Sequence, residues 1–133
     1  MSSTIILCPI SVGELLDKIS ILRIKLSKIS GERKKSVKKE LGALEKIYSE
    51  LKHPEGSEKL QQQLNEINKS MWEVNDMKRK KAKANEIDKE FIYWAVKEDE
   101  ENDRRFEIKK QINMLYKSSL IEEKGYDKYN ELS

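Results

Sequence analysis

Residues 11–29 read SVGELLDKISILRIKLSKI, and this stretch decides the fold. Ser11 follows a proline and Glu14 stands three positions later, which is the capping-box pattern of a helix start. Ile21 and Ile24 lie on the opposite side of this helix from a second apolar row, so the sequence predicts a central helix with two neighbours. That row has the alternating three- and four-residue spacing of a heptad seam, and it consists of Val12, Leu15, Ile19, Leu22, Leu26 and Ile29.

Three further amphipathic helices are expected after the first one. Ser30-Gly31 interrupts the first pattern, and a second apolar repeat runs over residues 37–51. A third repeat covers residues 60–74, and a fourth helix is expected over about residues 88–116. The turn-forming His53-Pro54 pair separates the second repeat from the third. The chain is therefore predicted to be all-α, an elongated helical bundle of about four helices with coiled-coil-like heptad seams.

Composition favours a single helical domain spanning residues 1–133. Charged residues make up 38% of the chain, whereas only five glycines and two prolines are present, and strand-rich folds need more turn residues than that. Residues 1–10 are expected to form an apolar arm or short strand, and residues 125–133 a tail. The arm lacks a basic region and is too short for a signal or a membrane span. We therefore expect a cytoplasmic protein without membrane contact.

Several kinds of chemistry are not expected. The chain has one cysteine and one histidine, which disfavours a thiol nucleophile or a histidine-based metal site. Glycine-rich phosphate loops are absent. The pairs Glu55/Glu58 and Glu73/Asp76 have the spacing of all-α nucleotide pyrophosphohydrolases, but one straight helix would hold them about 22 Å apart. We predict neither a metal nor a cofactor, and leave open whether the protein is an enzyme.

Basic residues gather in two runs, at residues 33–39 and 78–83. The overall balance of 27 basic to 24 acidic residues is close to even, whereas dedicated nucleic-acid binders carry a clear basic excess. No aromatic residue interleaves either run, so base stacking is not expected. Nucleic acid is therefore an unlikely partner, and any binding is expected to be weak and sensitive to salt.

Polar residues at positions 97–105 interrupt the fourth apolar pattern. They are either a solvated overhang or part of an inward-facing stripe, consisting of Glu98, Asn102, Arg105 and Lys109. Arg23 lies on the apolar face of the first helix, where it either reaches past that face into solvent or pairs with the acidic run. Trp72 is expected to pack the third helix against the fourth, with a platform for a stacked ring as the alternative.

Three stretches stand out together: PISVGELLDKI at residues 9–19, MWEVND at 71–76, and NDRR at 102–105 with its continuation to SLIEEK at 119–124. On the basis of these three stretches, nearly the whole chain resembles an uncharacterised family of small helical proteins found in bacteria and viruses. The resemblance implies the helical fold and no assigned activity. The chain departs from the family pattern at Arg23, Asp99 and Glu101. Nine polar positions match it and form the candidate pocket: Asp17, Lys18, Trp72, Asp76, Asn102, Asp103, Arg105, Lys109 and Asn113.

Three functions remain as hypotheses. The first is a self-associating interaction or scaffold module, most simply a homodimer, with another protein as a further possible partner. The second is a small-ligand-binding protein or enzyme with a polar pocket between the first, third and fourth helices. The third is a weak nucleic-acid accessory protein.

Overall fold

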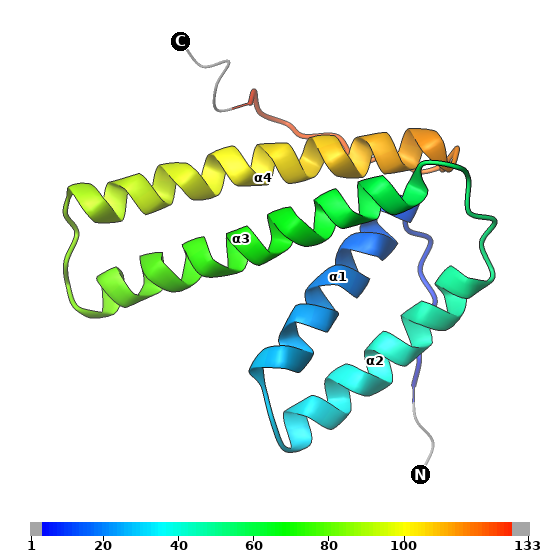
Figure 1. Ribbon diagram of the computed structural model, residues 1–133, viewed down its shortest axis with the longest axis horizontal. Coiled ribbons are helices and arrows are strands. Elements are labelled where there is room, and N and C mark those ends of the chain that lie inside the picture. The colour runs from blue at the N-terminus through cyan, green and yellow to red at the C-terminus, as the bar shows by residue number, and fades with distance from the viewer. Residues whose placement is uncertain (1–3, 129–133) are drawn as a thin grey trace.

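The computed structural model describes residues 4–128, and within them the chain forms four α-helices and no strand (Figure 1). The helices are α1 (Val12–Lys28), α2 (Glu32–Ser49), α3 (Ser57–Lys83) and α4 (Lys89–Leu115). The predicted all-α architecture of four helices is confirmed. Residues 4–10 of the expected arm are neither helix nor strand. Residues 1–3 of that arm and 129–133 of the expected tail lie outside the described residues.

The helix starts follow from short polar signals in the sequence. The side chain of Ser11 accepts a hydrogen bond from the backbone N–H of Glu14 at 3.1 Å, as the capping pattern predicts. Asp88 caps α4 in the same way, accepting from the N–H of Phe91 at 2.9 Å. Gly31 opens α2 with a φ of 71°, a backbone conformation that glycine adopts without strain.

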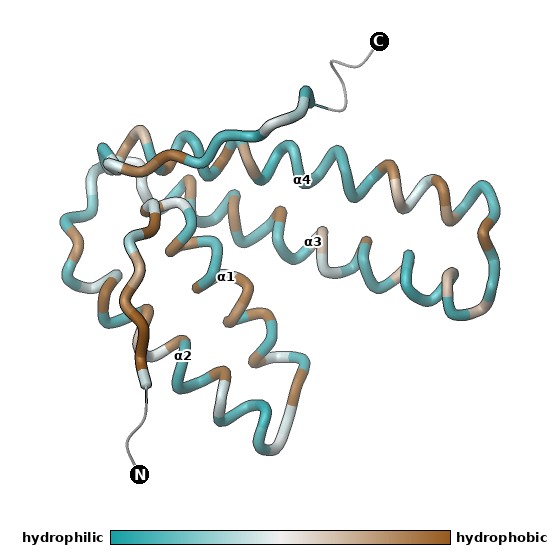
Figure 2. The backbone as a smooth tube through the Cα atoms, turned by 180° about the vertical axis from the view of Figure 1, so that it is seen from behind, coloured by the Kyte–Doolittle hydropathy of each residue, from teal (hydrophilic) through white to brown (hydrophobic). Residues whose placement is uncertain are grey.

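The four helices form two hairpins that diverge from a common end. α3 and α4 lie side by side as a long antiparallel pair, and α1 and α2 descend from the end where α3 begins and α4 finishes (Figure 1). α1 packs against all three other helices. α2 packs mainly along α1, and its Tyr48 also accepts a hydrogen bond from Gln61 of α3 at 2.6 Å. The other half of the α3–α4 pair extends beyond α1 as a two-helix arm (Figures 1 and 2).

The core lies where α1, α3 and α4 meet and continues between α1 and α2. Both rows of apolar residues on α1 find partners within the chain, because Leu22 joins the central cluster while Ile24 is also buried. The two-faced character of α1 is thus accounted for by its three neighbours. Buried members of the cluster come from all four helices: Leu15, Leu16, Ile19, Leu22, Leu41, Leu64, Ile67, Met71 and Ile112.

The N-terminal segment, residues 4–10, contrasts with this core. Figure 2 shows it as a hydrophobic stretch running past α2. Its side chains are largely in solvent: Ile5, Ile6 and Leu7 are 76%, 79% and 87% exposed. None of the helices in the described part of the chain combines the length and apolarity needed to cross a bilayer.

Candidate functional site

A group of polar side chains lies where α1, α3 and α4 meet, and we call it the polar junction (Glu14, Asp17, Asn68, Lys109 and Glu122). Asp17, Asn68 and Lys109 are buried, whereas Glu14 and Glu122 are partly exposed. Lys109 of α4 is 5% exposed. Its Nζ lies 2.8 Å from Glu14 Oε2, 3.0 Å from Glu122 Oε1 and 3.7 Å from Asp17 Oδ2. Three carboxylates from α1 and the C-terminal segment therefore surround one buried ammonium group.

Asn68 links α3 to the α1 side of the junction. Its Nδ2 donates to Asp17 Oδ1 at 2.9 Å and lies 3.2 Å from Ser20 Oγ. Its Oδ1 is buried and has no hydrogen-bond partner in the described part of the chain. Both carboxylate oxygens of Asp17 face partners, one on α3 and one on α4, so Asp17 connects three helices.

Gly13 sits next to this junction because α4 passes very close to α1. Its N–H donates to Asn113 Oδ1 at 2.6 Å. A Cβ at position 13 would lie 2.7 Å from the carbonyl oxygen of Lys109 and 3.0 Å from Asn113 Oδ1. Only glycine therefore allows α1 and α4 to approach this closely.

The charges at the junction shift the pKa of Lys109 and of Glu122 in opposite directions. Burial lowers the pKa of Lys109, but hydrogen bonds to Glu14 and Glu122 and the charge of Asp17 outweigh it, so the pKa is raised above its ordinary value. Burial raises the pKa of Glu122, but hydrogen bonds from Lys124 and Lys109 outweigh it and the net pKa is lowered. Both groups are thus held in their charged forms.

The shift at Glu122 predicts how stability depends on pH. A carboxylate whose folded-state pKa is lowered stabilises the fold above its unfolded value of 4.5, and this contribution is lost as pH falls through the lower folded value. Melts from pH 7 to pH 3 are expected to show a smaller loss of melting temperature below pH 4.5 for Glu122→Gln than for the parent. Identical pH profiles for the two proteins would contradict this assignment.

A second feature is the cleft between α1 and α3, which has a volume of about 430 Å³. Trp72 is half-buried in its wall. The rest of its lining is polar apart from Ile24 and includes three basic residues; it consists of Ser20, Arg23, Ile24, Ser27, Lys28, Asn65, Lys69 and Glu73. Arg23 is exposed, and its guanidinium lies 3.7 Å from the carboxylate of Glu45 of α2. Of the two expectations for Arg23, the structure therefore favours a side chain that reaches past the apolar face into solvent over one paired with the acidic run of α4.

Trp72 also borders a smaller hollow of about 170 Å³ with Asn75, Asp76 and Arg79. It is not a member of the central hydrophobic cluster. The expectation that Trp72 is a core residue packing α3 against α4 is therefore wrong. The indole lines the hollows that form where α1 diverges from α3.

The nine residues of the candidate pocket do not come together at one place. Asp17, Lys109 and Asn113 belong to the polar junction or its border, and Trp72 and Asp76 line the hollows on α3. Lys18 is exposed. The remaining three lie elsewhere on α4: Arg105 donates to Asn102 at 2.7 Å, and Asp103 lines a groove between α3 and α4.

Sequence reasoning did not predict that Asn68, Glu101 and Glu122 are buried or partly buried. For Glu101 a signal existed, because Trp94, Glu101 and Ile108 are spaced by seven residues and Ile112 follows four later. Asn68 follows Ile67 directly, and periodicity alone does not distinguish it from a surface residue. Glu122 lies beyond the last helix, where no repeat exists to place it.

The two basic runs lie far apart. The first opens α2 and the second ends α3 on the two-helix arm (Figure 1). Most of the second run is neutralised within the chain, since Lys78 pairs with Glu98, Lys80 with Asp76, and Lys81 with three acidic residues around the α3–α4 turn. The runs therefore do not form one continuous basic surface.

The fold and these features define a small all-α protein of two divergent helical hairpins, joined by a buried polar junction. The chain belongs to a family of unknown function, DUF6165, which matches residues 6–131. Comparisons with the curated proteins and with the solved structures find no match.

Proposed function

We propose that this protein binds a small anionic ligand with a flat ring in the cleft between α1 and α3. The observation that carries the proposal is the half-buried Trp72 in a cleft whose lining includes three cationic side chains, those of Arg23, Lys28 and Lys69. A volume of about 430 Å³ lies within the roughly 300–1,000 Å³ range of small-molecule sites.

The charges of the cleft select for an anion. The lining contains three cationic side chains and one carboxylate, that of Glu73. Lys28 and Lys69 make no ion pair with any residue of the described chain, so their charges are available to a ligand. Arg23 is held by Glu45 at 3.7 Å, a distance that leaves its guanidinium donors usable for bidentate contact with a phosphate or carboxylate.

Trp72 supplies the reason for a ring. An indole face offers a stacking surface that tolerates any planar π-system, and each stacked base is worth about 1–3 kcal/mol in nucleic-acid complexes. Ile24 of α1, which also lines the cleft, is apolar. A ligand that combines a planar heterocycle with a phosphate or carboxylate uses both kinds of wall.

Adenosine monophosphate is a suitable probe, with inorganic phosphate and adenosine as its two halves. At a hundred times its Kd a ligand stabilises the folded protein by about 2.7 kcal/mol, so the melting temperature should rise clearly with the nucleotide and less with either half. Trp72→Leu and Lys69→Gln are each expected to abolish most of this rise.

Lys18→Gln is the matched control, because Lys18 is an exposed lysine of α1 outside the cleft. It should leave the nucleotide-induced rise unchanged. A wild-type protein that does not respond to the nucleotide, or a Lys18→Gln variant that loses the response as fully as Lys69→Gln, would reject ligand binding in this cleft.

We further propose that two copies of the chain associate through residues 4–10. Four large apolar side chains of this segment are exposed, and its backbone makes no hydrogen bond within the described residues. Such an extended segment can pair with its own copy about a two-fold axis, which satisfies the backbone groups and buries the side chains of Ile5, Ile6, Leu7 and Ile10.

Sedimentation at micromolar concentration tests this second proposal. The parent is expected to have a dimer mass, and Ile6→Asp combined with Leu7→Asp a monomer mass. Ile92→Asp is the control, because Ile92 is also an exposed apolar residue but lies on the two-helix arm. A monomer mass for the parent across the dilution series would remove self-association as a function.

A further inference from the structure

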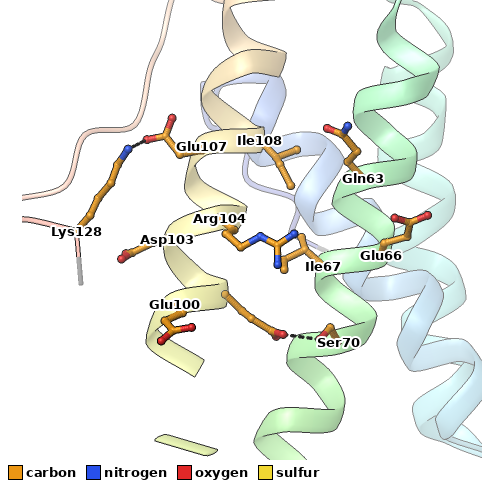
Figure 3. A pocket seen from close by; sticks show the side chains of 11 residues that line it. Gln63, Glu66, Ile67, Ser70, Glu100, Asp103, Arg104, Glu107, Ile108 and Lys128 are labelled. Atoms are coloured by element: carbon orange, nitrogen blue, oxygen red, sulfur yellow. Dashed lines mark hydrogen bonds and ion pairs between the residues drawn. The ribbon is translucent and has the colours of Figure 1, made fainter. Parts of the chain in front are cut away.

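A groove on the α3–α4 pair is separate from the α1–α3 cleft and shares no lining residue with it. It has a volume of about 680 Å³ and lies between α3, α4 and the C-terminal segment (Figure 3). Its lining is strongly acidic, with five carboxylates against the cations Arg104 and Lys128. The carboxylates belong to Glu66, Glu100, Glu101, Asp103 and Glu107.

Glu101 is the unusual member of this group because it is 3% exposed. Its Oε1 accepts a hydrogen bond from Ser70 Oγ of α3 at 2.6 Å, which is the dashed line at Ser70 in Figure 3. Its Oε2 is buried and has no hydrogen-bond partner in the described part of the chain. A buried carboxylate oxygen without a donor destabilises the fold, so a chain that keeps one gains if a ligand supplies the missing donor.

The spacing of the carboxylates in the groove favours an extended ligand with several positive charges over a single metal ion. Among residues 4–128 no three carboxylate, histidine or cysteine side chains converge as a metal ion requires. The carboxylates are instead spread along the helix, since Glu100 and Glu107 are about 10 Å apart along the α4 axis. An extended ligand with several spaced positive charges matches this distribution, whereas a single point charge contacts only part of it.

We propose that the α3–α4 groove binds a linear polyamine, with Glu101 as its anchor. One primary ammonium group of the ligand donates to Glu101 Oε2, next to the hydroxyl of Ser70. The remaining ammonium groups follow the acidic wall toward Glu100 or Glu107. Glu100 makes no ion pair within the described chain, whereas Glu107 is paired with Lys128, so a ligand ammonium would compete with Lys128 there.

Calorimetric titration of the full chain with spermidine tests the proposal. Loss of one hydrogen bond between charged groups weakens binding by roughly tenfold or more, so Glu101→Gln is expected to raise the Kd by about that factor. Glu100→Gln, at the more exposed wall, should raise it less. Because Glu101→Gln removes a buried, half-satisfied charge, its melting temperature is expected to equal or exceed that of the parent.

Glu40→Gln is the control for general electrostatic attraction, since Glu40 is an exposed acidic residue of α2 that does not line the groove. It should leave the spermidine Kd unchanged, and magnesium at equal charge concentration should displace little spermidine. Equal losses in Glu40→Gln and Glu101→Gln, or full displacement by magnesium, would overturn the proposal. An absence of spermidine binding would also overturn it. If an oligolysine peptide bound and spermidine did not, the groove would be assigned to a protein partner instead.

Discussion

Replacing Lys109 with alanine is expected to lower the free energy of unfolding by about 3–5 kcal/mol, the cost of leaving the buried charge of Asp17 without its cationic partner. The ammonium group of Lys109 lies between Glu14, Asp17 and Glu122 and is 5% exposed. Without it, the buried carboxylate of Asp17 keeps only its hydrogen bond from Asn68, and the partly exposed carboxylates of Glu14 and Glu122 lose their shared cation. Urea denaturation followed by circular dichroism measures the change.

Arg105→Ala is the control for this variant. Arg105 lies one turn earlier on α4, is half-buried, and donates to Asn102 on the same helix at 2.7 Å. Its removal strands no buried carboxylate, so the expected loss is within about 0.5 kcal/mol. Equal losses for the two variants would show that the junction carries no special share of the stability.

Gly13→Ala is the substitution with the second largest expected effect. A methyl group at position 13 would meet the backbone carbonyl of Lys109 at 2.7 Å, and backbone does not move aside as a flexible side chain does. Forcing extra volume into a packed contact costs about 1–3 kcal/mol. The same shift would lengthen the hydrogen bond between the Gly13 N–H and Asn113, so α1 and α4 are expected to separate locally.

Gly42→Ala provides the opposite outcome within the same protein. Gly42 lies in the middle of α2, and a Cβ there would meet nothing within 4 Å. Alanine is favoured over glycine inside a helix by about 0.5–1 kcal/mol, so this variant should be more stable than the parent. A destabilised Gly42→Ala together with an unchanged Gly13→Ala would contradict the packing described for both positions.

The helices were predictable because their signals are local. Ser11 and Asp88 cap α1 and α4 at the expected positions, and Ser30-Gly31 and the turn at His53 separate the others. The start of α2 was placed later than the structure has it, since its first turn is polar and lacks the apolar repeat. Amphipathic periodicity detects the apolar part of a helix and not its solvated ends.

The site was less predictable because it depends on which helices meet. Lys109 was identified as a polar position in an apolar seam, but its partner Glu122 follows the last helix, where no periodic pattern applies. Trp72 is a large apolar residue beside Met71 of the apolar seam, and the divergence of α1 from α3 makes it a cleft residue rather than a core residue. Helical periodicity gives the direction of a side chain around its own axis, and not the neighbour that it faces.

The single-sided packing of α2 has a consequence for how the molecule opens. The backbone of α2 lies against α1 alone, and the Tyr48–Gln61 hydrogen bond ties its side chains to α3. We therefore expect α2 to unfold locally while α1, α3 and α4 stay assembled. Such an opening would carry Glu45 away from Arg23 and change the charge of the α1–α3 cleft without disturbing its walls. Amide hydrogen exchange that is faster in α2 than in α1 would show that α2 opens locally. It would also indicate how often the cationic side chain of Arg23 in the cleft is released from Glu45.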